Sequence, residues 1–261
     1  MKYSWLFFCA LLLTVVLSGC ASGNIFNSHT QTPIIVTRIN EPVKLDGKLD
    51  EPFWAQLPEH HFTQIDDISN KSPLEAARAR QDKFQGAWVK AAYDDKYVYI
   101  AARLENDDVI SYARKDGGFL FQQADTLEIF FWAEGKSPYW EMYSTPSGHK
   151  HNLAYPSGGV LSVSAFLLNA GVAPGLEIAS HVYGKINDRS DRDECWTTEM
   201  RISRKMFANA GVPFEPGTAW RILAARYGYS GFLYRRQASA FPKQPAFNFH
   251  ARNYYAPVIF R

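Results

Sequence analysis

The stretch WVKAAYDDKYVYIAARL, residues 88–104, gives the strongest indication of the fold class of this chain. Two runs rich in aromatic and β-branched residues, 88–93 and 97–104, flank the polar turn Asp94-Asp95-Lys96. Runs of this composition, separated by a short polar turn, are typical of paired β-strands. The stretch therefore predicts a β-hairpin.

Outward from this hairpin, runs with the same character recur between clusters of Gly, Pro, Asp and Asn. We expect further strands at 126–133, 139–145, 176–185, 196–202, 219–229, 232–238 and 256–260. Two short helices are expected. One covers 50–57, with Asp50 as its N-terminal cap, and the other covers 203–210 and ends before Gly211. Many short strands with little helix predict an all-β antiparallel sandwich, jelly-roll-like, as a single domain over 33–261.

The first residues have the order of an export signal. Lys2 precedes the apolar run 5–17, which as a helix would span only about 20 Å and so is too short to cross a bilayer. Leu17-Ser18-Gly19-Cys20 resembles the bacterial lipobox, which implies that the cysteine is lipidated and becomes the mature N-terminus. The alternative is an ordinary signal peptide in which Cys20 is incidental.

The lipobox resemblance divides the N-terminal part into a signal peptide, 1–19, and a lipidated tether, 20–32. Ala21 follows the cysteine, as in lipoproteins sorted to the outer membrane of Gram-negative cells. We therefore expect the bilayer to be one partner of this chain. Residues 22–32 are mostly small and polar, which suits a flexible linker.

Composition excludes some classes of partner. The chain has 28 basic and 26 acidic residues and no visible basic stripe, so we expect no nucleic-acid partner. Of its three cysteines only Cys195 lies in the expected domain, so the domain has no internal disulfide. Cys195 stands beside large apolar residues and is expected to be a buried, inert thiol.

Strand alternation places two glutamates among aromatic residues. Glu128 shares a face with Phe130 and Trp132, and Glu141 shares one with Tyr139 and Tyr143. One interpretation is a wet outer face with arginine partners. The other is a sugar site, in which aromatic rings stack on the sugar and carboxylates accept bonds from its hydroxyls. The pattern alone leaves both open.

Several segments together resemble carbohydrate-binding module family 9, in order and over nearly the whole domain. They are VKLDGKLDEPFW (43–54), VKAAYDDKYVYIAA (89–102), DTLEIF (125–130), YWEMYSTPSG (139–148), WTTEMRIS (196–203) and the closing segment 248–260.

The resemblance implies a β-sandwich that binds the ends of sugar chains and often carries structural calcium. Two tryptophans that hold the sugar in characterised members correspond here to Phe121, displaced by about one place, and to Phe249. The polar sugar-binding positions fall on or near Glu128 and Glu141. The expected function is a membrane-anchored lipoprotein that binds a glycan for polysaccharide capture or catabolism.

Acidic loops at 66–67, 106–108 and 188–194 could supply oxygen ligands for such a calcium ion. His149 and His151 are a potential metal pair, although a solvated loop after the turn 145–148 is the simpler interpretation.

Two other functions remain open. Glu128 and Glu141 could form the acid and base of a glycoside hydrolase. Related sandwich domains bind haem, for which Met142 or Met200 with a histidine could provide the ligands.

Overall fold

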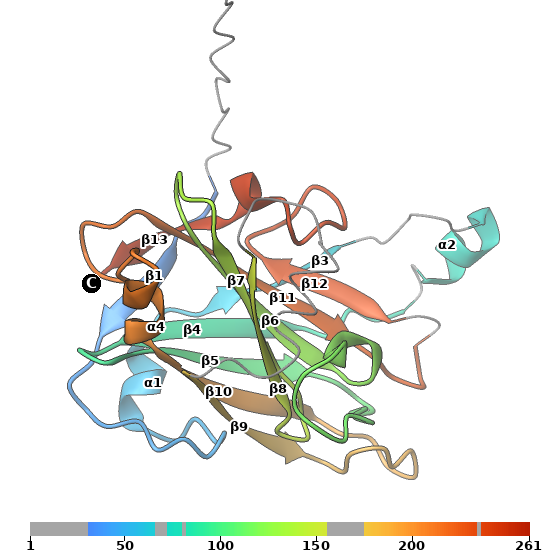
Figure 1. Cartoon of the computed structure of the whole chain (residues 1–261). Helices are drawn as coiled ribbons and strands as arrows, with labels where there is room; N and C mark the ends of the chain where they lie inside the picture. The colour runs from blue at the N-terminus through green and yellow to red at the C-terminus, as the bar shows by residue number, and fades with distance from the viewer. Residues whose placement is uncertain (1–30, 66–71, 80–81, 156–174, 234–235) are drawn as a thin grey trace, which may run out of the picture.

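The computed structural model describes residues 31–65, 72–79, 82–155, 175–233 and 236–261 (Figure 1). The signal peptide, Cys20, most of the tether and the Asp66-Asp67 loop lie outside these ranges, so the expectations for them remain predictions. Within the described ranges, no helix is both long enough and apolar enough to cross a membrane.

The described elements are mostly strands. The strands are β1 (Ile34–Arg38), β2 (His60–His61), β3 (Thr63–Ile65), β4 (Ala87–Tyr93), β5 (Tyr97–Glu105), β6 (Thr126–Ala133), β7 (Tyr139–Ser144), β8 (Lys150–Tyr155), β9 (Leu176–Tyr183), β10 (Cys195–Ser203), β11 (Trp220–Gly228), β12 (Gln237–Phe241) and β13 (Ala256–Phe260). The helices are α1 (Pro52–Gln56), α2 (Pro73–Ala79) and α4 (Arg204–Asn209), with 3-10 turns η1 (Leu120–Gln122) and η2 (Arg252–Tyr254).

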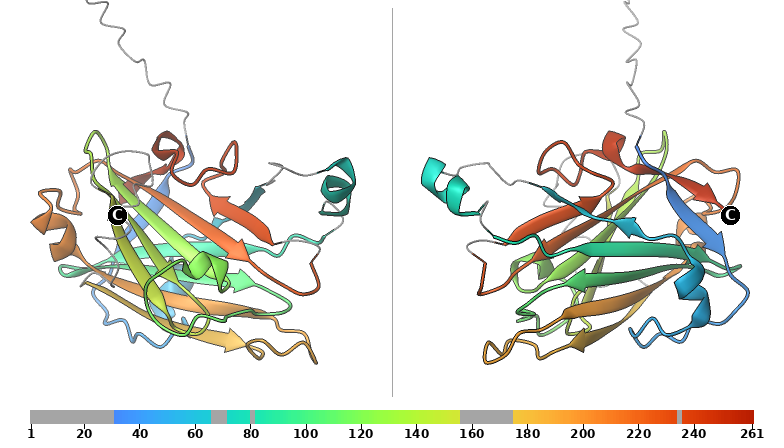
Figure 2. Two further views of the ribbon diagram at one scale, coloured as in Figure 1. Left: turned by 45° about the vertical axis from the view of Figure 1, so that its right-hand side comes forward. Right: turned by 180° about the vertical axis from the view of Figure 1, so that it is seen from behind.

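The strands form one sheet that folds over into two facing layers (Figures 1 and 2). Its order is β8-β7-β6-β11-β13-β1-β4-β5-β10-β9, with β12 on β11, β3 on β12 and β2 on β4. The two ends of this order come close, since the hydroxyl groups of Ser144 at the end of β7 and Thr198 on β10 are 2.6 Å apart. The mostly β sandwich predicted from the sequence is confirmed, in a nearly closed form.

The sheet is mixed, which corrects the prediction of a purely antiparallel sandwich. β1 pairs in parallel with β13, where Ile34 lies opposite Val258, and with β4, where Val36 lies opposite Ala91. Parallel neighbours need a long crossover rather than a tight turn. The segment 39–86 between β1 and β4, with α1 and α2 in it, provides that crossover.

The hairpin of β4 and β5 is confirmed. The carboxylate of Asp94 accepts hydrogen bonds from the backbone N–H groups of Lys96 and Tyr97, each at 2.7 Å, and so closes the turn. The prediction of a strand at 232–238 is wrong. Phe232 lies in a turn, where its backbone N–H donates a hydrogen bond to the Ser230 hydroxyl, and the strand β12 begins only at Gln237.

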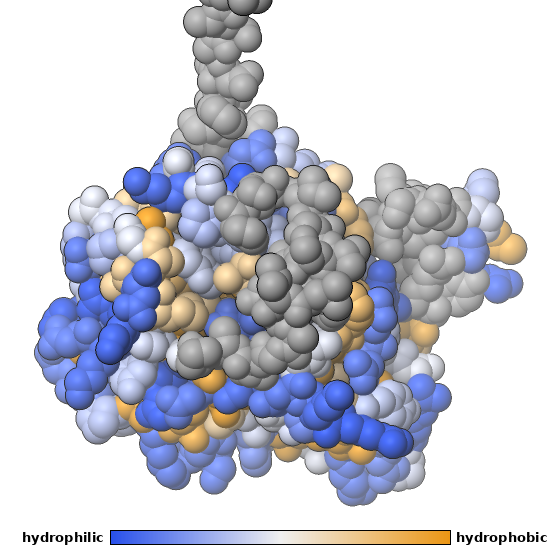
Figure 3. Space-filling view, viewed as in Figure 1, coloured by the Kyte–Doolittle hydropathy of each residue, from blue (hydrophilic) through white to orange (hydrophobic). Residues whose placement is uncertain are grey.

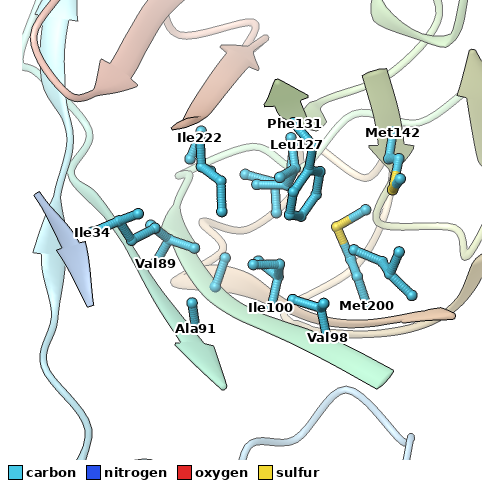
Figure 4. Close-up of a cluster of buried hydrophobic side chains, with 14 of the residues drawn as sticks. Ile34, Val89, Ala91, Val98, Ile100, Leu127, Phe131, Met142, Met200 and Ile222 are labelled. Atoms are coloured by element: carbon cyan, nitrogen blue, oxygen red, sulfur yellow. The ribbon is translucent and has the colours of Figure 1, made fainter. Parts of the chain in front are cut away.

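The apolar core lies between the two layers (Figure 4). Leu127, Ile129 and Phe131 enter it from β6, as the alternation predicts, and Ile100 on β5 faces them from the other layer. The opposite side of β6 carries Glu128 and Phe130 away from this core.

Two further expectations concern groups in or near the core. Met142 and Met200, the haem-ligand candidates, are fully buried among its apolar side chains. The Cys195 thiol is free and buried, as expected, and burial raises its pKa to about 11.

The Asp-Gly segment at the start of the domain is tied to the sheet by one carboxylate. The backbone N–H groups of Asp46 and Gly47 donate to Glu199 Oε2 on β10, at 3.0 and 2.9 Å. The indole N–H of Trp54 on α1 donates to Glu199 Oε1 at 3.1 Å. Glu199 thus holds Asp46, Gly47 and Trp54 of the segment 43–54 against β10.

Candidate functional site

A pocket of about 230 Å³ opens on the side of β6, β7 and β8 that faces away from the core. It is lined by Gly118, Phe119, Phe121, Glu128, Glu141, Tyr143, Leu153, Tyr155, Tyr227, Phe247, Asn248, Phe249 and His250. The four residues predicted from the sequence, Phe121, Glu128, Glu141 and Phe249, thus lie around one cavity.

The aromatic wall of the pocket comes from segments far apart in the chain. The ring of Phe121 stacks on Tyr227 of β11, with 5.5 Å between ring centroids and 28° between planes. Phe249 packs against Tyr227 at 5.5 Å and against Phe247 at 5.3 Å. Phe249 is only 5% exposed, so it supports the wall, whereas Phe119 is 41% exposed at the rim.

Glu141 is held as a hydrogen-bond acceptor. Its carboxylate accepts the phenol O–H of Tyr143 and that of Tyr155, the latter at 2.7 Å. The Tyr155 ring stacks on Tyr139 with 4.5 Å between centroids, and Tyr139 Oη is 3.0 Å from His250 Nδ1. Burial raises the pKa of Glu141, while the charge of His250 and the two phenol hydrogen bonds act against that rise.

Glu128 has fewer hydrogen-bond partners than Glu141. It is 2% exposed, and its Oε1 has no hydrogen-bond partner. Burial, followed by the charge of Glu141, raises the pKa of Glu128 well above its ordinary value. A buried oxygen without a partner costs about 1–3 kcal/mol, a cost that a ligand could remove.

The wet outer face considered for these glutamates is therefore wrong. Glu141 is 3% exposed, and neither carboxylate forms an ion pair with a lysine, arginine or histidine of the described residues. Residues of η1 and of the segment 247–250 cover this side of the sheet and line the pocket together with the two glutamates. Strand alternation carries no information on that cover.

The geometry also bears on the hydrolase alternative. Glu128 lies opposite Tyr143, and Glu141 lies opposite Phe130, so the two glutamates are diagonal neighbours on adjacent strands. Diagonal neighbours have Cα atoms about 7–8 Å apart. Carboxyl groups about 5–10 Å apart serve glycoside hydrolysis, so the spacing is compatible with either binding or catalysis.

Asp125, just before β6, positions the loop that carries Phe121. Its carboxylate accepts from Asn106 Nδ2 at 2.7 Å, from Ile110 N at 2.8 Å and from Tyr229 N. The phenol of Tyr229 in turn donates to the carbonyl of Phe121 at 2.5 Å. The aspartate of the segment 125–130 is thus a structural residue beneath the pocket.

The described part of the chain brings no group of three or more His, Cys, Asp or Glu side chains together as a metal site. In the acidic loops, Asp107 pairs with Arg192 at 2.6 Å and Asp108 with Arg189 at 3.1 Å. These carboxylates are engaged by arginines, so the structural calcium remains a prediction without assigned ligands.

The histidine pair is also corrected. His151 is fully buried on β8, where a solvated loop was expected, and half-buried His149 lies 3.4 Å from Asp116.

The hydrophilic side chains of the molecule cover most of the lower part of the face seen in Figure 3, with small hydrophobic groups between them. The pocket differs from such a surface because aromatic rings and buried carboxyl groups occur together in it.

Comparisons with known proteins give structural likeness only. No protein-family model matches the chain, and no curated protein matches it in sequence. A Bacteroides uniformis protein described as a candidate carbohydrate-binding protein superposes with a TM-score of 0.60 at 12% identity, over 88% of this chain and 99% of that one.

A carbohydrate-binding module of family 9 from Caldicellulosiruptor kristjanssonii superposes with a TM-score of 0.53 in two solved structures. The complex with cellotriose is matched at 14% identity over 88% of this chain and 94% of the other. The complex with glucose is matched at 15% identity over 88% and 96%. The chain is therefore similar in fold to the family 9 carbohydrate-binding modules.

Proposed function

We propose that this chain is a carbohydrate-binding protein that holds the end of a glycan in the pocket between η1, β6–β8 and the segment 247–250. The observation that carries the proposal is the unpartnered Oε1 of Glu128 in a pocket walled by aromatic rings. The shared fold supports it, because a module of that fold has been solved with cellotriose and with glucose.

The residues of the pocket suit a sugar ring. Aromatic faces pack against its C–H groups, while Glu141 and Glu128 exchange hydrogen bonds with its hydroxyls. A cavity of about 230 Å³ is smaller than the roughly 300–1,000 Å³ typical of drug-sized ligands, which favours a single sugar unit. Phenylalanines replace the family's tryptophans, so we expect net binding of roughly −5 kcal/mol, a Kd in the high micromolar range or weaker.

We also propose that a lipid on Cys20 anchors the protein to the outer membrane, with 20–32 as the tether. The support is the lipobox resemblance of Leu17 to Cys20 after an apolar run. In that position the domain would capture polysaccharide near the membrane surface.

Titration calorimetry of the mature protein in detergent, first with cellotriose and glucose and then with a panel of soluble oligosaccharides, tests the sugar site. Replacing Phe121 with alanine should weaken binding by about 1–3 kcal/mol, the usual cost of losing a stacking ring. The matched control is Tyr183→Ala, an exposed aromatic on β9, which should bind as the wild type does.

Equal affinities for wild type and Phe121→Ala would place the site elsewhere, and no binding to any glycan would refute the function. Release of reducing sugar from the panel would instead favour the hydrolase.

A further inference from the structure

Two buried carboxyl groups face one pocket without a cation between them. Glu128 and Glu141 are 2% and 3% exposed, and neither forms an ion pair with a described lysine, arginine or histidine. Keeping two acidic groups buried and close together is costly unless something compensates their charge. The phenols of Tyr143 and Tyr155 donate to Glu141, whereas Oε1 of Glu128 has no hydrogen-bond partner. The charge of Arg236 favours the ionised form of Glu128, but Arg236 forms no ion pair with it.

The rings around the two carboxyl groups add attraction for a cation. Ring faces attract a nearby cation, most strongly where water is excluded. Two rings of the pocket already hold a cation, since the Arg236 guanidinium lies 5.0 Å from the ring centroid of Tyr227 and 5.9 Å from that of Phe247. Aromatic faces combined with acidic groups are the chemistry that recognises an ammonium group.

We infer that the pocket selects a sugar carrying a protonated amino group, such as glucosamine, over the matching neutral sugar, with the ammonium group on Glu128. The inference rests on the proposed function and adds the charge of the ligand. It uses the unpartnered Oε1 of Glu128, which a donor with a full positive charge satisfies better than a neutral hydroxyl. Glu141 keeps its two phenol donors.

The inference requires a proton to leave the site. Burial and the charge of Glu141 raise the pKa of Glu128 well above its ordinary value, while the charge of Arg236 acts against that rise. Glu128 therefore holds its proton at pH values where a free glutamate is ionised. The other charged or titratable groups around it are Glu141, Tyr143, Tyr155, Tyr227, His250 and, at the rim, Arg236. An ammonium group on Glu128 stabilises the ionised carboxylate, so binding an amino sugar should release a proton to solvent.

The test is calorimetric titration of the mature protein with glucosamine, N-acetylglucosamine and glucose at about pH 6, where such an amine is protonated. N-acetylglucosamine places a neutral amide at the same carbon, so it separates charge from shape. We expect wild type to bind glucosamine about tenfold or more tighter than glucose, the size of one charged hydrogen bond. Repeating the glucosamine titration in buffers of different ionisation enthalpy should reveal the released proton.

Glu128→Gln is the decisive variant, because an amide has nearly the shape of a protonated carboxyl group but cannot ionise. It should bind glucosamine and glucose equally and release no proton. The matched control is Glu177→Gln, which removes one negative charge from an exposed pair with Arg201 on the other layer. That control should keep both the preference and the proton release.

Equal or tighter binding of glucose by wild type would overturn the inference and leave the proposed function standing. A preference for glucosamine that survives in Glu128→Gln would also overturn it. If none of the three sugars, nor cellotriose, binds, the proposed function fails and the inference fails with it.

Discussion

Replacing Gly47 with alanine tests whether the Asp-Gly segment locks the start of the domain onto the sheet. The backbone of Gly47 has φ +80°, where an L-residue costs about 1–2 kcal/mol. A methyl group there would lie 2.7 Å from the carbonyl carbon of Ser180 and 2.8 Å from the amide nitrogen of His181, both backbone atoms of β9. The segment must shift to relieve that contact, which weakens the hydrogen bond from Gly47 to Glu199.

A hydrogen bond to a charged group contributes about 1.5–3 kcal/mol, so we expect a total loss of about 3–5 kcal/mol in the free energy of unfolding. The matched control is Gly135→Ala in the turn between β6 and β7. Gly135 has φ +74°, but a methyl group there meets no atom within 4 Å, so this change should cost only about 1–2 kcal/mol.

Urea denaturation of both variants, with melting curves, measures the difference. For a domain of this size each 1 kcal/mol lowers the Tm by about 2–4 °C. The Gly47 variant should thus melt several degrees below the Gly135 variant. If the two variants lose the same stability, the contact with β9 does not constrain the segment and the reasoning is wrong.

Three further predictions concern the pocket, the anchor and the metal. A buried Glu128 keeps its proton in the folded state, whereas the unfolded chain releases it near pH 4.5, so wild type should lose stability relative to Glu128→Gln as pH rises above that value. Urea denaturation at about pH 5 and pH 8 measures this, and a constant difference between the two proteins would contradict the raised pKa of Glu128. Cys20→Ala should leave an unlipidated precursor; incorporation of labelled fatty acid into this variant would disprove the anchor. Chelation should lower the melting temperature if a structural calcium is bound only by the folded state, and an unchanged melt with no metal by elemental analysis would remove that prediction.

The faces of the strands could be predicted from the sequence, but their burial could not. Alternation alone placed Glu128 and Glu141 on the side of β6 and β7 away from the core. Whether that side is wet depends on what covers it, and the cover comes from η1 and the segment 247–250, more than a hundred residues apart. Tyr227 joins the pocket from β11, and no local pattern marks it as a pocket residue.

The pairing between strands that are distant in the chain could not be predicted from the sequence either. The parallel position of β1 between β13 and β4 depends on a crossover whose path no local periodicity records. A loop was expected at His149 and His151, where the structure has the strand β8. The polar residues of β8 do not show the alternation of apolar and polar side chains that marks a strand in the sequence. His151 is nevertheless fully buried there, on the same side of the sheet as Tyr143, whose ring centroid lies 5.9 Å from that of the imidazole.

The mostly β class, the main hairpin, the face of each central strand and the four residues that meet at the pocket were predictable from the sequence. They were predictable because side-chain alternation and turn composition are local properties, and because ordered motifs resemble one family. The packing of distant segments is needed to see that the two glutamates are buried together, that one oxygen of Glu128 lacks a partner and that Phe249 supports the wall. Those properties are set by which distant segments pack against each other, and burial in turn sets the protonation of the carboxyl groups.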